Sequence, residues 1–144
     1  MKRVFNTNYN HRSLDFALFI LRVGASCFIL THGWSKVSKV LSGAEIQFAD
    51  PIGLGMVTSF YLVIFAEVIC AVLLLIGLAT RLALIPLIIN MAVVVFVVQF
   101  NEGFQKMELP AFYLLVFVFL MFAGPGRYSI DNVISRRGNR RRTF

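Results

Sequence analysis

The chain has 144 residues, of which 58% are hydrophobic and 15% are charged, and its formal net charge at pH 7 is +7. This length is that of a single domain, and a mean hydropathy of +0.78 excludes an ordinary soluble globular protein. The positive charge would suit a nucleic acid or an anionic membrane surface, and its distribution along the chain decides between these two partners.

The apolar residues fall into four long blocks, at residues 14–30, 59–79, 82–100 and 109–123. A helix needs roughly 20 apolar residues to cross a bilayer, and three of the blocks come close to that length. Because lipid offers the backbone no hydrogen-bond partner, such segments must cross as helices. A soluble bundle would need polar helix faces, whereas residues 82–98 contain only Asn90 as a strongly polar side chain. The sequence therefore predicts an all-α integral membrane protein, a four-helix antiparallel bundle.

The polar segment 1–13 precedes the first helix, for which Ser13 and Asp15 are candidate N-terminal caps. This helix is expected to end at about residue 31, where it meets His32-Gly33-Trp34, a sequence typical of a membrane interface. The outer connection 35–51 has apolar residues at helical spacing, which predicts a short surface helix within it.

The second helix is predicted at residues 56–79. The link Thr80-Arg81 is so short that the third helix must be its antiparallel neighbour. We expect the third helix to end near residues 99–102, and Pro110 suits the first turn of the fourth. Gly124-Pro125-Gly126 then stops the fourth helix.

The basic residues favour one membrane orientation. With the N-terminus in the cytoplasm, ten of the fourteen Lys and Arg residues fall on the cytoplasmic side, three fall outside, and Arg22 lies within a span. The positive-inside rule then places both termini in the cytoplasm, and the inner (plasma) membrane is the expected location. The arginine-rich stretch 136–142 is most simply a topology anchor that touches anionic headgroups, so no nucleic-acid partner is predicted. Binding of RNA or a protein by this tail is the alternative.

No metal site is predicted. Cys27 and Cys70 both lie in spans and form no Cys-x-x-Cys pair, so they are expected to act as small apolar residues. The two histidines, His11 and His32, fall on opposite sides of the membrane, which argues against a multi-histidine haem or metal centre.

Two charged residues lie far from the ends of their spans, Arg22 in the first helix and Glu67 in the second. A charge at the centre of a bilayer costs on the order of 3 kcal/mol, so both should face the bundle interior with a partner. Their depths differ, and a direct bond would need tilted helices or an intervening water or ligand. Asn90 is level with Arg22 and is a second candidate partner. The pair is either a structural clasp or a site that binds a polar ligand head or relays a proton.

A second group of polar residues is expected near the outer surface, where the first helix ends, the third ends and the fourth begins. A histidine beside carboxylates at an interface can titrate near neutral pH and could protonate a quinone oxygen or bind a metal. The alternative is an interfacial Trp belt with a snorkelling lysine. The members of this group are His32, Trp34, Lys36, Gln99, Glu102 and Glu108.

Over residues 14–131 these elements, in this order, resemble the DoxX family of small four-helix membrane proteins. The matching residues are Arg22, His32-Gly33-Trp34-Ser35-Lys36, Glu67, Gly77-Leu78-Ala79-Thr80-Arg81, Gly103-Phe104, Glu108-Leu109-Pro110 and Gly124-Pro125-Gly126-Arg127-Tyr128-Ser129-Ile130-Asp131. Many members carry a histidine where this chain has Gln99, which weakens any shared metal or proton role there. The resemblance implies a membrane subunit of the kind named in thiosulfate:quinone oxidoreductase or linked to oxidoreductase complexes that detoxify oxidants.

We therefore expect a cytoplasmic segment 1–13, a membrane domain 14–131 and a basic cytoplasmic tail 132–144. The predicted function is a quinone-associated or membrane-anchoring subunit of an oxidoreductase complex, not catalytic alone. The alternatives are a small proton-coupled transporter, which would need to dimerise, and a purely structural scaffold. The expected partners are the lipid bilayer, soluble or membrane oxidoreductase subunits and a second copy of the chain. The candidate proton donors are Glu67 and His32, and the candidate ligand-binding residues are Arg22, His32, Lys36, Glu67, Asn90, Gln99 and Glu108.

Overall fold

The structure is a computed structural model that describes residues 10–45 and 48–140. Within these ranges every regular element is a helix. Four helices are long and apolar enough to cross a membrane: His11–Leu41, Met56–Ile76, Thr80–Val98 and Phe104–Ala123. The all-α class and the four spans predicted from the sequence are thus confirmed.

Two of the four spans contain a π-helical section, in which each hydrogen bond reaches one residue farther than in an α-helix. The second span consists of α2 (Met56–Ile64), η1 (Phe65–Cys70) and α3 (Ala71–Ile76), and the third of α4 (Thr80–Val93) and η2 (Val94–Val98). The first and fourth spans are the α-helices α1 (His11–Leu41) and α5 (Phe104–Ala123).

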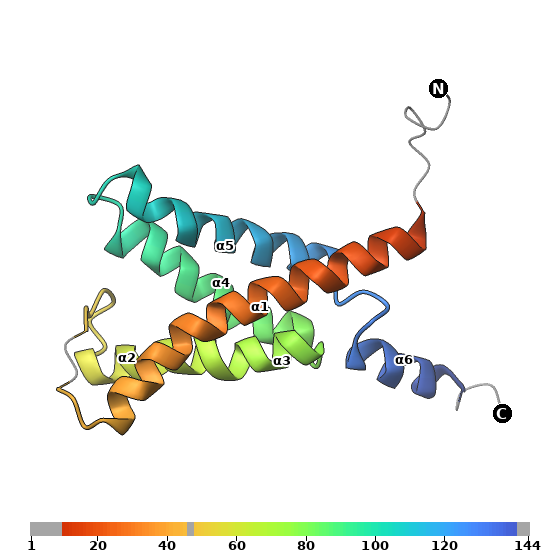
Figure 1. Ribbon diagram of the computed structural model, residues 1–144, viewed down its shortest axis with the longest axis horizontal. Helices are drawn as coiled ribbons and strands as arrows, with labels where there is room; N and C mark the ends of the chain where they lie inside the picture. The colour runs from red at the N-terminus through yellow and green to blue at the C-terminus, as the bar shows by residue number, and fades with distance from the viewer. Residues whose placement is uncertain (1–9, 46–47, 141–144) are drawn as a thin grey trace.

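The spans pack as a bundle in which α4 lies beside α5 and α1 lies beside α3 and η1 (Figure 1). The first turn of α1 and the final helix α6 (Ile130–Arg140) lie at one end of the bundle. The end of α1, the start of α2 and the turn between η2 and α5 lie at the other. One end therefore carries both the beginning and the end of the described chain.

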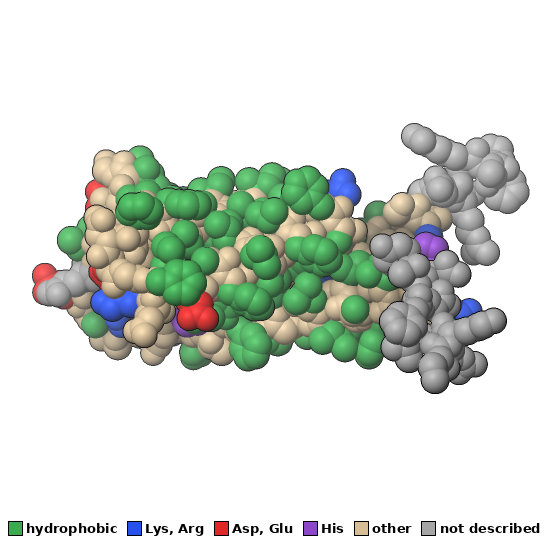
Figure 2. Space-filling model, turned by 90° about the horizontal axis from the view of Figure 1, so that it is seen from above, with side chains coloured by type: hydrophobic (Ala, Val, Ile, Leu, Met, Phe, Trp, Pro, Cys, Tyr) green, Lys and Arg blue, Asp and Glu red, His purple; other side chains and the backbone are tan. Residues whose placement is uncertain are grey.

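The core contains apolar side chains from all four spans. Ile29, Leu74, Leu87 and Phe117 come from successive spans, and each is at most 1% exposed. Large apolar side chains also cover the outside of the spans, including Phe28 and Phe96, and Figure 2 shows them over much of one face. Such an apolar exterior is unfavourable in water and suits a molecule surrounded by lipid.

The first helix is longer than the sequence predicted. It continues without a break to Leu41, so the predicted end near residue 31 and the separate surface helix in 35–51 are wrong. No proline interrupts this stretch, and Gly33 is buried inside the helix instead of ending it. The N-cap is also different, because the Asn10 side chain accepts a hydrogen bond from the Arg12 amide at 3.1 Å.

The segment after the fourth span folds back onto the bundle before α6 begins. Asp15, expected as a cap of the first helix, instead accepts a hydrogen bond from the Arg127 amide at 3.1 Å. The predicted basic tail 132–144 starts inside α6, whose Ile130, Val133 and Ile134 are exposed.

Candidate functional site

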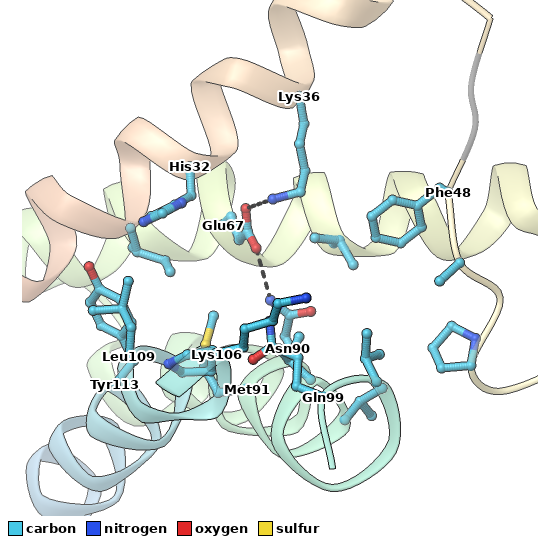
Figure 3. Close-up of a pocket in the computed structure, with 18 residues that line it drawn as sticks. His32, Lys36, Phe48, Glu67, Asn90, Met91, Gln99, Lys106, Leu109 and Tyr113 are labelled. Carbon is cyan, nitrogen blue, oxygen red and sulfur yellow. Dashed lines mark hydrogen bonds and ion pairs between the residues drawn. The ribbon is translucent and has the colours of Figure 1, made fainter. Parts of the chain in front are cut away.

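A cavity of about 360 Å³ lies in the half of the bundle that is far from α6, bounded by α1, η1, α4, η2 and α5. Its walls are mostly apolar, and its polar side chains come from all four spans (Figure 3). These polar residues are His32, Lys36, Glu67, Asn90, Gln99, Lys106 and Tyr113.

Glu67 on η1 lies at the centre of the polar group, between Lys36 of α1 and Asn90 of α4 (Figure 3). Its Oε2 is 2.5 Å from the Lys36 Nζ, and its Oε1 accepts a hydrogen bond from the Asn90 Nδ2 at 3.2 Å. Glu67 is 4% exposed, so both carboxylate oxygens meet protein donors instead of water. An opposite charge and a donor amide offset the desolvation of the carboxylate.

Gly33 allows α1 to approach η1 closely enough for this ion pair to form. A Cβ atom at Gly33 would lie 2.7 Å from the Val68 Cγ2 and 2.9 Å from the Glu67 carbonyl oxygen. Lys36 follows Gly33 by one helical turn, on the same face of α1. The π-helical geometry of η1 adds a second local irregularity at Glu67, and such bulges are frequent at functional sites.

The remaining polar residues of the cavity lie around this group. The His32 ring packs edge to face against Tyr113, with 6.3 Å between the ring centroids. Lys106 forms an ion pair with Glu102 at 2.8 Å. The buried Oε1 of Gln99 has no hydrogen-bond partner within the described residues, so it is an acceptor that a bound molecule could satisfy.

Arg22 lies in a different place, toward the α6 end of the bundle. Its guanidinium donates from Nη2 to the Tyr128 carbonyl oxygen at 2.6 Å and from Nη1 to the Pro125 carbonyl oxygen at 3.3 Å. Arg22 is 1% exposed, and a Cβ atom at Gly77 would overlap its Nη1 atom. Gly77 also has a φ of +71°, a left-handed conformation that glycine adopts without strain.

Asp131 completes this second polar cluster, just beyond the fourth span. Its carboxylate accepts hydrogen bonds from the Ala79 amide at 2.7 Å and the Thr80 amide at 2.8 Å, which caps the start of α4. Burial alone would raise the pKa of Asp131, but these hydrogen bonds and the Arg22 charge outweigh it and hold the pKa below its usual value. The cluster joins the chain after α5 to the turn between α3 and α4.

The two intramembrane charges therefore have separate partners. Asn90, expected as a partner of Arg22, donates to Glu67 instead, because η1 and α4 are adjacent and bring the two side chains together. Arg22 and Glu108 do not line the cavity. The other five candidate ligand-binding residues do: His32, Lys36, Glu67, Asn90 and Gln99.

Two cavity residues, Lys106 and Tyr113, are not among those predicted from the sequence. Lys106 lies in the predicted connection between the third and fourth helices, and Tyr113 lies within the apolar block 109–123. A tyrosine three residues after Pro110 places a hydroxyl on one face of the fourth helix, and this spacing could have identified it.

The cysteines are free, Cys27 exposed and Cys70 buried. In the described part of the chain, no group of three or more His, Cys, Asp or Glu side chains could hold a metal ion.

Comparison with known proteins identifies the family. The chain is 35% identical over 85 residues to an uncharacterised membrane protein of Mycobacterium tuberculosis, and the match covers 49% of this chain and 52% of that protein. The chain thus spans about half the length of this relative. No solved structure matches the chain. The DoxX family model matches residues 17–100, which include Lys36, Glu67 and Asn90. The chain therefore belongs to the DoxX family.

Proposed function

We propose that this protein is the membrane subunit of a quinone-linked oxidoreductase and that it binds the quinone head in the cavity around Glu67. The observation that supports this function is the Lys36–Glu67–Asn90 group inside a mostly apolar cavity within the membrane-spanning bundle. Ligand sites commonly combine apolar walls with a few convergent polar groups that fix the orientation of the ligand.

The polar residues suit the chemistry of a quinone. Reduction of a quinone to a quinol takes two electrons and two protons. Lys36 donates a hydrogen bond to one carbonyl oxygen. Glu67 or His32 first takes up a proton from water and then passes it to a ligand oxygen, once for each of the two protons. The electrons come from a partner subunit, which this chain holds at the membrane.

The orientation with both termini in the cytoplasm of the inner membrane is part of the proposal. It would place the Glu67 cavity in the outer half of the bilayer, because the start of α1 and α6 lie at the opposite end of the bundle. Soluble or membrane oxidoreductase subunits are the proposed partners, and a second copy of the chain is a further one.

The transporter alternative has less support. It required Arg22, Glu67 and Asn90 to line one path, whereas Arg22 binds the carbonyl oxygens of Pro125 and Tyr128 away from the cavity. A scaffold without a ligand leaves the cavity volume without a role.

The test is the quinone content of the protein purified in mild detergent. We expect quinone to copurify with the wild type and to fall on the order of tenfold in Lys36→Met, since a hydrogen bond from a charged donor is lost. Lys39→Met is the matched control, because Lys39 is exposed on the same helix and should leave the quinone content unchanged.

Removing Lys36 alone leaves Glu67 buried without its cation, which could unfold the protein. The double variant Lys36→Met with Glu67→Gln removes both charges of the pair together, so the same measurement is made without a buried unpaired carboxylate. A wild-type protein free of quinone, or a double variant that is folded and keeps it, would contradict the proposed function.

A further inference from the structure

A second cavity, of about 280 Å³, lies beside the first, between the second span and α4. Its walls are almost entirely apolar, and several of them are exposed on the outside of the bundle: Leu62, Phe65 and Ile89 are 49%, 48% and 56% exposed. Ile89 is the midpoint of the span Thr80–Val98, about 13 Å from either end at 1.5 Å per residue. The cavity therefore opens sideways, at a depth where the surroundings are hydrocarbon.

The two cavities share walls. Five residues line both of them: Phe48, Pro51, Val63, Asn90 and Val93. Asn90 is the most informative of these, because its amide donates to Glu67 in the first cavity while the residue also borders the second. The polar group and the lipid-facing cavity are thus one side chain apart.

The shared wall formed by Phe48 and Pro51 is held in place by the chain around it. Phe48 packs edge to face against Phe60 of α2, with 5.2 Å between the ring centroids. Asp50 accepts hydrogen bonds from the amides of Leu54 and Gly55, at 3.0 Å and 2.8 Å, and the Gly55 hydrogen bond is the main cause of its lowered pKa. The contacts of Phe48 and Asp50 thus fix the part of the chain before α2 that borders both cavities.

Hydrocarbon tails gain little by leaving lipid for an apolar protein groove, because the two environments are equally apolar. The second cavity, called the groove below, instead provides a route from the bilayer to the first cavity. A molecule with a polar head and a long tail can bring its head to Lys36 and Glu67 only if its tail has a path through the helix wall to the bilayer.

We propose that the second cavity is the lateral opening through which the ligand of the Glu67 site enters from lipid, and that it holds the first part of the ligand's hydrocarbon tail. The ligand is thus an amphiphile, with a compact head that bears oxygen atoms and a tail that lies between α2, η1 and α4. This inference rests on the proposed function for the identity of the head as a quinone. The argument for a hydrocarbon tail comes from the second cavity and does not depend on that identity.

The test compares two tryptophan variants on α4. Ile89→Trp fills the groove, whereas Ile85→Trp adds the same side chain one turn away, at an equally lipid-facing residue that lines neither cavity. Each protein is purified in mild detergent, and the copurifying molecules with hydrocarbon tails are measured by mass spectrometry. We expect the amount of copurifying ligand to fall on the order of tenfold in Ile89→Trp, because the tryptophan side chain fills the second cavity and excludes the tail. In Ile85→Trp the amount of ligand should stay at the wild-type level.

A variant at the other wall, Leu62→Trp, repeats the measurement should Ile89→Trp fail to fold. Equal amounts of ligand in the groove variant and in Ile85→Trp would overturn the proposal, and so would a wild type that retains no tailed molecule. A molecule lost from Ile89→Trp but kept by the folded double variant Lys36→Met with Glu67→Gln would be a lipid lodged in the groove alone, which also overturns it.

The outcome separates this inference from the proposed function. A tailed molecule other than a quinone that is lost from both Ile89→Trp and the double variant, and retained by Ile85→Trp, would support the groove while contradicting the quinone. A quinone retained by both tryptophan variants and lost from the double variant would support the quinone while contradicting the groove.

Discussion

At the scale of single residues, the two buried charges have different kinds of partner. Glu67 meets a lysine and an amide from two other spans, whereas Arg22 meets backbone carbonyl oxygens of the segment after the fourth span. An ion pair beside a cavity can exchange a protein partner for a ligand. A guanidinium that donates to main-chain oxygens and is covered by Gly77 instead joins the first span to the segment after the fourth. Ligand binding is therefore proposed for Glu67 alone, and a structural role for Arg22.

This assignment predicts a loss of stability without a loss of ligand when Arg22 is shortened. In Arg22→Gln the carbonyl oxygens of Pro125 and Tyr128 lose a charged donor, so the free energy of unfolding should fall by about 2–3 kcal/mol. Thermal unfolding in detergent measures the change, and the quinone bound per folded protein should stay constant. Arg12→Gln, at an exposed residue of the same helix, should unfold like the wild type. An Arg22→Gln protein with wild-type stability would contradict the structural role.

At the scale of elements, the close contact of α1 with η1 assembles the site. The sequence predicts that Gly33 belongs to an interfacial helix end, because His32-Gly33-Trp34 follows an apolar block. In the structure the helix continues, Trp34 is 66% exposed on its outside, and Lys36 is turned toward Glu67. Helix length is a local property, but which face of α1 meets η1 depends on packing between residues that are 34 positions apart, Gly33 and Glu67.

Two glycines of α1 provide a matched test of this contact. Gly33→Ala places a methyl group within 3 Å of Val68 and the Glu67 carbonyl oxygen, so we expect a loss of about 1–3 kcal/mol in unfolding free energy and weaker ligand binding. Gly24→Ala has no atom within 4 Å of the new methyl group, and it should be neutral or stabilising by up to about 1 kcal/mol. Thermal unfolding and the ligand content of the two variants test whether the close contact of α1 with η1 is required. Equal behaviour would show that α1 and η1 can move apart freely.

At the scale of the whole molecule, the start of α1 and the final helix α6 lie at the same end of the bundle. Four crossings require this arrangement, and in the described residues the first turn of α1 and the helix α6 carry Arg12, Arg136 and Arg137 at that end. The proposed membrane orientation rests on charge, because positive residues are retained on the cytoplasmic side.

Labelling of single cysteines tests the orientation. In a background with Cys27→Ser and Cys70→Ser, we expect Asn101→Cys to react with a membrane-impermeant maleimide in intact cells. Ser135→Cys, on α6, should react only after the cells are permeabilised. Both residues are exposed in the structure, so a difference in reaction reports the side of the membrane and not burial. The reversed pattern would contradict cytoplasmic termini.

Much of this architecture is determined by the sequence alone. Hydropathy is summed over a whole segment, and the bilayer allows only one backbone solution for it, so the four spans and the all-α class could be predicted. The cost of a buried charge likewise indicated that Arg22 and Glu67 would be sheltered, and both are.

The partners of those charges were decided only by the tertiary structure. Arg22 and Glu67 looked like one pair because both are rare charges in lipid, and depth along a helix was the only coordinate that the sequence supplied. The partners of Arg22 and Glu67 are determined by the rotation of each helix about its axis, the close approach at Gly33 and the return of the chain over Gly77. These features depend on contacts between residues far apart in the chain, and no local pattern encodes them.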